Sequence, residues 1–409
     1  MLEKTVLISG VGIAGPTLAY WLQRAGFQPT LVECAPAPRA GGFVIDFWGL
    51  GYDVAERMGL TAELHSLGYH MRELRIVDRC GRRVAGFGTR AFQELTGGRF
   101  ITLARSDLSR LLFQKIEHTT EVIFDEEVVA LEQQTDCVTV EFKRTPPRRF
   151  GLVIGADGLH SRIRALTFGP QQHFEKQLGY IAAAFEVCDY RPRDEDVYVM
   201  LGRPGKMLGR IALHEDRTLF LFVFAAEPDL LSSPLDTAQK KSILREHFEG
   251  EGWECGGILS KLDAQEEFYF DRVSQIRLDS WSRGRVALVG DAAFCVSLTA
   301  GQGSALAMAA AYVLAGEIVR TPWEPQQAFL RYEEQLYRFI TSKQRAAERF
   351  AAAFAPKTRL GLMLRNFVVN LAGLPGMAKL ALGPGIVDSI TLPQYSAFRH
   401  VSLTPPKPK

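Results

Sequence analysis

The sequence predicts an α/β protein in which a Rossmann-like nucleotide-binding domain carries an inserted antiparallel β-sheet domain and a C-terminal helical segment. Three short apolar strands, at residues 5–9, 152–154 and 286–289, each lead into a glycine-containing turn. Residues 178–224 form a block in which strand-like runs alternate with turn residues, as in an antiparallel sheet. Apolar residues between 329 and 340 then follow helical spacing.

The composition is that of an ordinary globular enzyme. The 409 residues are 47% hydrophobic, enough for a large core, and 48 basic residues balance 46 acidic ones to a net charge of +2. No basic block indicates a nucleic-acid partner, and no run of about 18 apolar residues indicates a membrane span. The six cysteines form no CxxC pair and the eight histidines no HxxxH pattern, so we expect reduced thiols, a cytoplasmic location and no metal site.

The first motif is the run Gly10-Val11-Gly12-Ile13-Ala14-Gly15, which follows a strand and begins a helix expected at residues 14–25. The first glycine permits a sharp turn, the second lets the backbone approach a pyrophosphate, and the third lets helix and strand pack closely. Glu33 ends the second strand, where a carboxylate can accept hydrogen bonds from a ribose. Strand, turn, helix and acid together predict dinucleotide binding.

Two further strands deliver an aspartate at the carboxyl edge of the sheet, where ligands bind in open α/β folds. Asp157 and Gly158 follow residues 152–154, although Asp157 could equally cap the helix that begins after Ser161. Gly290, Asp291 and Ala292 follow residues 286–289, and a second glycine turn, Gly301-Gln302-Gly303, begins a long helix. The dipole of that helix would favour the electron-rich edge of a flavin ring.

In order and spacing, these motifs resemble those of the class A flavoprotein monooxygenases, which share the fold of para-hydroxybenzoate hydroxylase and include aromatic-ring and tetracycline-type hydroxylases. The resemblance covers about residues 5–320 and implies FAD as the cofactor. It places Arg105 near the FAD phosphates or ribityl chain, and Arg39 and Asp46 in a loop past the flavin, although surface roles for these three remain open. The cofactor-binding residues that it implies are Gly10, Gly12, Ile13, Ala14, Gly15, Glu33, Arg39, Asp46, Arg105, Asp157, Gly158, Gly290, Asp291, Ala292, Gly301, Gln302 and Gly303.

The sequence departs from the family pattern around the flavin. Phe294 replaces a frequent histidine, and Val296 and Leu298 replace prolines. Ala305 and Ala310 stand where an asparagine and an aspartate are common. These changes leave the backbone turns possible but make the surroundings of the flavin more apolar, and Phe294 could line a pocket or simply pack.

The resemblance also implies the reaction and the division of the chain. NAD(P)H would reduce FAD, and O2 would add at the flavin C4a position to give a hydroperoxide that hydroxylates a hydrophobic, aromatic or polyketide-like small molecule. NAD(P)H would bind transiently, because no second glycine-rich nucleotide fold is visible. We expect the FAD-binding domain at 1–75, 98–177 and 275–325, the substrate domain at 76–97 and 178–274, and helices and a tail at 326–409. A flavin-dependent reductase or dehydrogenase of the same fold, or a non-catalytic carrier protein, are the alternatives.

Two segments have open interpretations. Phe185, Tyr198, Phe220, Phe222 and Phe224 could wall a water-excluding pocket, although alternation of the last three equally predicts a sheet core. Residues 360–386 are apolar, and we expect a helical lid or bridge there rather than membrane contact, although Arg359, Arg365 and Lys379 permit the latter. No general base and no oligomeric state can be named.

Overall fold

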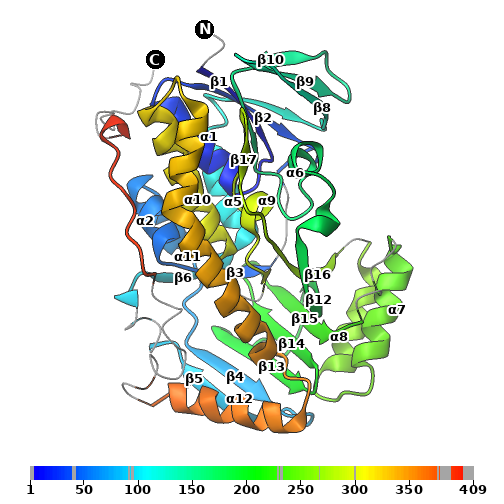
Figure 1. Cartoon of the computed structure of the whole chain (residues 1–409). Coiled ribbons are helices and arrows are strands. Elements are labelled where there is room, and N and C mark those ends of the chain that lie inside the picture. The colour runs from blue at the N-terminus through cyan, green and yellow to red at the C-terminus, as the bar shows by residue number, and fades with distance from the viewer. Residues whose placement is uncertain are drawn as a thin grey trace.

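A six-stranded sheet assembles from strands that lie far apart in the sequence (Figure 1). The computed structural model describes residues 4–38, 43–90, 93, 96–227, 230, 234–266, 268–298, 301–374, 377 and 388–398. The sheet order is β17 (Ser282–Arg283), β18 (Val286–Leu288), β11 (Leu152–Gly155), β1 (Thr5–Ser9), β2 (Gln28–Glu33) and β7 (Glu121–Phe124). All neighbours are parallel except β17 and β18. Their near-continuous apolar sequences suit a sheet buried on both faces.

Helices of small and aromatic residues pack beside this sheet. Helix α1 (Ala14–Arg24) contacts the long helix α10 (Gly303–Arg320), with the rings of Trp21 and Tyr312 5.0 Å apart. Among the described residues, α10 alone is long and apolar enough to cross a membrane, and 83% of it is buried inside the protein. Helix α2 (Leu50–Arg57) packs closely on α10 where Gly51 meets Ala305. A Cβ added to Gly51 would lie only 2.6 Å from the Ala305 Cβ, so the small residues on both helices permit this approach. A core helix of a globular domain explains both features.

A second, seven-stranded sheet forms the other half of the molecule. Its order is β16 (Tyr269–Ile276), β12 (Glu175–Cys188), β15 (Arg217–Ala225), β14 (Lys206–Ala212), β13 (Val197–Arg203), β4 (Glu73–Val77) and β5 (Arg83–Gly88). Neighbours are antiparallel except β13 and β4. Helices α7 (Thr237–Phe248) and α8 (Cys255–Lys261) cover one face (Figure 1).

The aromatic residues expected to wall a pocket fall on opposite faces of this sheet. Phe185, Phe220, Phe222 and Phe224 are buried in the core under α7 and α8, so for them the sheet-core interpretation is correct. Tyr198 belongs to the other face, where it packs with a small apolar cluster that includes Phe43 and Val44. Alternation along a strand predicts two faces but does not say which of them meets the cofactor domain.

The remaining elements connect the two halves. The pair β3 (Val44–Trp48) and β6 (Phe100–Ala104) lies between them, and β8 (Val128–Gln133), β9 (Val138–Phe142) and β10 (Arg148–Phe150) form a small separate sheet. Helix α11 (Pro325–Phe354) runs from one half to the other, and α12 (Arg359–Ala372) lies across the outside of β5 (Figure 1). The other helices are α3 (Thr61–Leu67), α5 (Arg105–Gln114), α6 (Arg162–Thr167), α9 (Asp291–Phe294) and the 3-10 turns at Gln171–His173, Leu262–Ala264 and Ser396–Phe398.

We propose the domain division given by the sequence, with the sheet pairing as its support. Strand β4 begins at Glu73 and β12 at Glu175, so the chain enters the seven-stranded sheet within a few residues of the expected boundaries.

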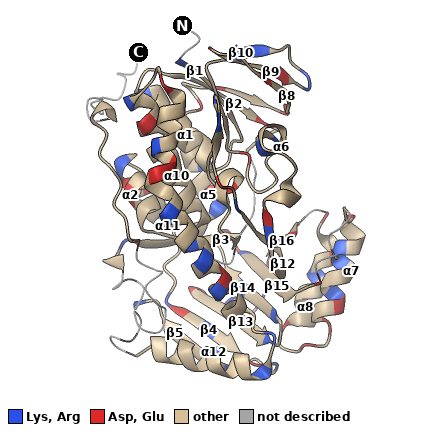
Figure 2. Cartoon of the chain, viewed as in Figure 1, with Lys and Arg blue, Asp and Glu red and all other residues tan. Residues whose placement is uncertain are grey.

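Charged residues of both signs are spread over the two halves, whereas α12 carries no acidic residue (Figure 2).

Candidate functional site

The parallel register brings the three motifs to one edge of the six-stranded sheet. Ser9 is paired with Gly155, and Gly155 with Leu288, so the chain leaves all three strands at the same level. Backbone hydrogen bonds continue past the strand ends, from Ala156 N to Ser9 O at 2.8 Å and from Val289 N to Gly155 O at 2.9 Å. The glycine and aspartate turns at 10, 157 and 290 therefore lie side by side.

Gly10 is required where the first two turns meet. Its φ of +111° lies outside the range that side chains prefer, and a Cβ there would overlap the Ala156 carbonyl oxygen and lie 2.7 Å from its carbon. A Cβ on Gly15 would in turn overlap the Gly10 carbonyl oxygen. At Gly12, by contrast, the nearest group is the Arg105 guanidinium, 3.7 Å from an added Cβ. The turn is thus closed on its inner side and open at Gly12, beside a positive charge.

The start of α1 offers free donors beside this opening. Ile13 is the N-cap residue and makes no side-chain cap hydrogen bond, so the N–H groups of Ala14 and Gly15 in the first turn lack intrahelical partners. These N–H groups and the helix dipole suit an anion such as a pyrophosphate.

Glu33 lies at the end of β2, and its carboxylate organises the first turn. One oxygen accepts a hydrogen bond from Val11 N at 2.9 Å, and the other accepts one from Ala35 N at 3.1 Å. Oε1 also accepts from Cys34 Sγ at 3.4 Å, whereas Oε2 keeps a second lone pair, so Glu33 can still accept a hydrogen bond from a ribose hydroxyl.

Asp157 precedes helix α6 and accepts hydrogen bonds from the first residues of that helix. Its carboxylate accepts hydrogen bonds from Ser161 Oγ at 2.5 Å, Arg162 N at 2.8 Å and Ile163 N at 3.0 Å. Burial raises the pKa of this carboxyl, while these donors oppose that shift. The N-cap residue of α6 is Ser161, whose hydroxyl accepts from Arg164 N, so Asp157 supports the helix start without being its N-cap. Gly158, with φ +80° and nothing within 4 Å of an added Cβ, continues the turn.

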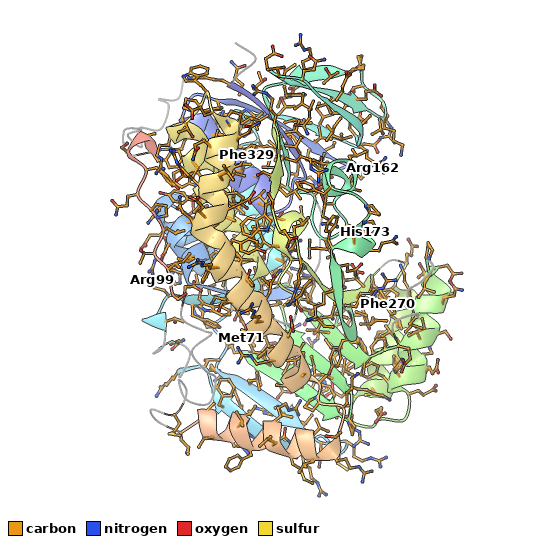
Figure 3. All side chains as sticks on the ribbon, viewed as in Figure 1. Met71, Arg99, Arg162, His173, Phe270 and Phe329 are labelled. Carbon is orange, nitrogen blue, oxygen red and sulfur yellow. The ribbon has the colours of Figure 1, made fainter. Side chains whose placement is uncertain are left out.

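Arg164 joins the second motif to the third, a role that the sequence did not reveal. Its fully buried guanidinium donates to Ala292 O at 2.9 Å, to Leu159 O at 2.7 Å and to Gln171 at 3.0 Å. Burial lowers its pKa. Arg162, by comparison, extends from the outer side of α6 (Figure 3). The only signal in the sequence was an arginine at helical position three, which is also common on helix surfaces.

Asp291 begins α9 directly after Gly290, whose φ is +65°. Burial raises the pKa of the Asp291 carboxyl, and the positive charge of Arg105 opposes that shift. A Cβ added to Gly303, the first residue of α10, would lie 3.8 Å from an Asp291 carboxylate oxygen. The third strand turn and the second glycine turn, Gly301 to Gly303, thus share one small region with Arg105.

Asp46 lies where β3 meets the seven-stranded sheet. It accepts hydrogen bonds from Thr102 Oγ1 at 2.6 Å and from Tyr198 Oη at 2.7 Å, and burial raises its pKa. The carboxylate thus links the two halves of the protein rather than standing free in a loop. Arg39, the other loop residue that we predicted, lies outside the described residues.

Tyr269 is a further residue that sequence reasoning missed. It lies in β16, with its ring 5.6 Å from that of Phe43, in the cluster that includes Tyr198. Burial raises its pKa well above the usual value, and Asp291 and Arg105 are among the charges that act on it. It therefore connects the seven-stranded sheet with the third motif. No local pattern singles out an aromatic residue at the start of a strand.

These features fit FAD. The open turn at Gly12, the uncapped start of α1, Glu33 at the strand end and the buried Asp291 beside Arg105 supply donors and acceptors in the order that a dinucleotide needs. A cavity of about 490 Å³ between β12 and the end of α11 is lined by none of these residues. Among the described residues, no group of three His, Cys, Asp or Glu side chains could hold a metal ion.

The family comparison agrees with the geometry. A family model described as an FAD binding domain matches residues 3–337, most of the chain. The chain belongs to this family. A flavin-dependent monooxygenase from an unknown prokaryotic organism is 32% identical over 397 residues, which cover 95% of this chain and 98% of that protein.

Two further proteins are similar to this chain over most of their length. An uncharacterized protein of Mycobacterium tuberculosis is 37% identical over 351 residues, 83% of this chain and 92% of that protein. The crystal structure of tetracycline destructase Tet(55) superimposes with a TM-score of 0.80 at 31% identity, covering 96% of this chain and 99% of the other. The protein is thus an FAD-dependent oxidoreductase of the class A monooxygenase type.

The flavoprotein accommodates its departures from the family pattern by packing. Phe294 is buried, with its ring 4.7 Å from that of Trp281, so the packing interpretation of this residue is correct. Ala305 and Ala310 are buried in α10, and Ala305 meets Gly51 of α2. A larger polar residue at 305 would separate these helices.

Proposed function

We propose that this flavoprotein uses NAD(P)H and O2 to hydroxylate a hydrophobic small molecule, aromatic or polyketide-like in character. The observation that carries the proposal is the convergence of Gly10, Asp157 and Asp291 at one sheet edge that faces an apolar cluster on the substrate sheet. The relatives named as monooxygenases and a tetracycline destructase support the reaction class and the kind of substrate.

We assign the cofactor contacts residue by residue as part of this proposal. The turn from Gly10 to Gly15, including Ile13 and Ala14, would hold the pyrophosphate, and Glu33 the adenosine ribose. Arg105, with Asp291 and Ala292, would contact the phosphate–ribityl region. Residues 301–303 would lie beside the flavin ring, where the start of α10 favours negative charge. Bound FAD supplies the redox chemistry by accepting a hydride from NAD(P)H and activating O2.

The substrate would meet the apolar cluster between the two sheets. Tyr69 and Met71 are buried there, and Phe43, Leu221 and Tyr269 are partly buried. Such a surface excludes water from the reacting atoms and leaves phenolic hydroxyls, such as that of Tyr269, to orient a polar group. The hydrogen bond from Tyr198 to Asp46 would keep this surface in place against β3.

The test is to purify the protein, record its visible spectrum, and screen phenols, polyketides and terpenoids for stimulated NADPH and NADH oxidation. We expect a yellow protein and a product that gains one oxygen atom from labelled O2. A product that gains two hydrogens without O2 consumption would indicate the reductase alternative. A colourless protein that cannot be loaded with FAD would indicate the carrier alternative.

We also propose a cytoplasmic location. The support is that all six cysteines are free thiols, three of them buried, as expected for a protein folded in a reducing compartment.

A further inference from the structure

Helix α12 presents large apolar side chains to solvent. Leu360, Met363, Leu364 and Phe367 are 76%, 68%, 63% and 65% exposed, and Leu374, just beyond the helix, is 54% exposed. Their spacing of three, four and seven residues puts them on one side of the helix. Figure 3 shows side chains projecting from α12 away from the body of the protein. Contiguous exposed apolar patches of this kind mark interaction sites.

The inner side of the helix is mixed in character and includes the half-buried Leu362, Arg365 and Val369. Asn370 accepts a hydrogen bond from Gly86 N at 3.0 Å, and the Arg365 guanidinium donates to Phe354 O at 3.2 Å. The only fully buried residue of α12 is Ala372. An ordinary surface helix turns its large apolar side chains toward the core, whereas α12 also carries large apolar side chains on its outer side.

The helix nevertheless has a defined beginning. Thr358 is its N-cap residue, and its hydroxyl accepts a hydrogen bond from Gly361 N at 3.1 Å. The apolar face therefore belongs to a folded element with its own start signal.

The sequence that contains α12 carries charged residues of one sign only. From residue 349 to residue 387 the sequence contains no aspartate or glutamate, although the whole chain has 46 of them in 409 residues. The same stretch contains five basic residues, Arg349, Lys357, Arg359, Arg365 and Lys379. Figure 2 shows α12 without any acidic residue. Arg359, the first residue of the helix, is exposed beside Leu360, whereas the ammonium of Lys357 lies 5.7 Å from the centroid of the Tyr180 ring.

The exposed apolar side chains of α12 and the lack of acidic residues around it together indicate which partner could cover this helix. Two copies of the chain that paired through α12 would bring the Arg359 charges of both copies to one interface without an acid in the same segment to neutralise them. An anionic lipid surface satisfies both features, since its acyl region accepts the apolar side chains and its headgroups neutralise the bases.

We propose that α12 docks this protein on an anionic membrane surface, with its exposed apolar side chains in the headgroup–acyl boundary. The sequence favoured a lid or bridge for this segment, whereas the solvent exposure of its apolar side favours the interfacial alternative. Because α12 lies on β5 of the substrate sheet, docking would bring that sheet close to lipid, where hydrophobic small molecules concentrate. The inference does not depend on the proposed reaction.

The test is co-sedimentation of the FAD-loaded full chain with lipid vesicles. We expect binding to vesicles of phosphatidylcholine with phosphatidylglycerol, weak binding to phosphatidylcholine alone, and release as salt screens the headgroups. Leu360→Ser and Phe367→Ser should each weaken binding about tenfold, because each removes one large apolar side chain from the boundary. Arg359→Gln should weaken it roughly fivefold, as expected for the loss of one charge near an anionic surface.

Matched controls lie on α11. Leu330 is 52% exposed on that helix, so Leu330→Ser removes a comparable side chain away from the proposed surface, and Arg338→Gln does the same for charge. Both should leave vesicle binding unchanged. Flavin absorbance and thermal unfolding establish that each variant is folded, and the lipid and salt dependence of the unmodified protein tests the proposal without any variant.

Absence of binding to the anionic vesicles would overturn the proposal, as would equal binding to both vesicle types. So would a dimer in sedimentation analysis that Leu360→Ser dissociates in the absence of lipid, since α12 would then bind a second copy. Equal losses for Leu330→Ser and Leu360→Ser would show that the binding surface is not α12.

Discussion

Substitution of Gly10 by alanine tests how the first two motifs are joined. Gly10 has φ +111°, and an added Cβ would overlap the Ala156 carbonyl oxygen and approach the Asp157 Cα to 2.9 Å. The neighbouring groups are backbone atoms of the second motif, so they cannot move aside as a flexible side chain could. Gly10→Ala should therefore displace the turn that we propose holds the pyrophosphate.

The magnitude has two parts. Holding an alanine at this φ costs about 1–3 kcal/mol, and displacing the packed backbone costs a further ~1–3 kcal/mol. Together we expect a loss of about 2–6 kcal/mol in the free energy of unfolding. Gly26→Ala is the matched control, because Gly26 also has a positive φ, +79°, but a Cβ there meets nothing within 4 Å. It should lose only about 1–2 kcal/mol.

The assay combines urea unfolding with flavin content. Gly10→Ala should retain much less FAD per polypeptide than the unmodified protein, and its FAD affinity should fall at least about tenfold if 1.4 kcal/mol of the displacement reaches the bound state. Gly26→Ala should retain FAD normally. If the two variants unfold alike and both keep their flavin, the contact between Gly10 and Ala156 does not govern the cofactor site.

Three further predictions concern polar groups of the site. Arg164→Met should lower the free energy of unfolding by about 2–4 kcal/mol, because it leaves buried carbonyls of Leu159 and Ala292 unpaired, whereas the exposed Arg162→Gln should change it by no more than about 0.5 kcal/mol; equal effects in urea unfolding would contradict this. Tyr198→Phe removes a donor from the buried Asp46 carboxylate and should cost about 1–3 kcal/mol, against about 0.5–1.5 kcal/mol for Tyr180→Phe, which loses a bond to the Ala355 carbonyl; the reverse order in chemical denaturation would refute the argument. The hydrogen bond with Asp271 raises the pKa of His160, so its stabilisation is complete below the unfolded pKa of about 6.5 and is lost as pH rises through the higher folded value; unfolding of the unmodified protein and of His160→Gln should differ at about pH 5.5 and converge at high pH, by less than about 1 kcal/mol because the imidazole is half exposed, and a difference that grows with pH would exclude this explanation.

The parts that the sequence predicted well are those specified by neighbouring residues. Strand β1 ends at Ser9 and helix α1 begins at Ala14, as expected, because the apolar run and the glycines act locally. Helix α10 begins at Gly303 for the same reason. Once three parallel strands were expected, their shared carboxyl edge followed from general sheet geometry, and the structure confirms that edge.

Contacts between distant residues could not be predicted in this way. Asp46 meets Tyr198 across 152 positions, and Arg164 meets Ala292 across 128. The alternation of Phe220, Phe222 and Phe224 indicated a buried face but carried no information on whether α7 or the cofactor domain covers it. Likewise, the apolar residues of α12 predicted a helix, whereas its placement on β5 depends on distant contacts such as the hydrogen bond from Gly86 N to Asn370.

The dispersal of the cofactor strands along the chain has a consequence for synthesis. Strands β1 and β2 emerge first, but β18 and α10, which complete the sheet edge, are made some 250 residues later. A nascent chain at the ribosome therefore cannot form the whole coenzyme site until nearly three quarters of the polypeptide exists, and the apolar edge of β11 awaits its partner throughout. Premature termination before residue 286 should accordingly leave a product that needs chaperones or degradation, however complete its first glycine turn is.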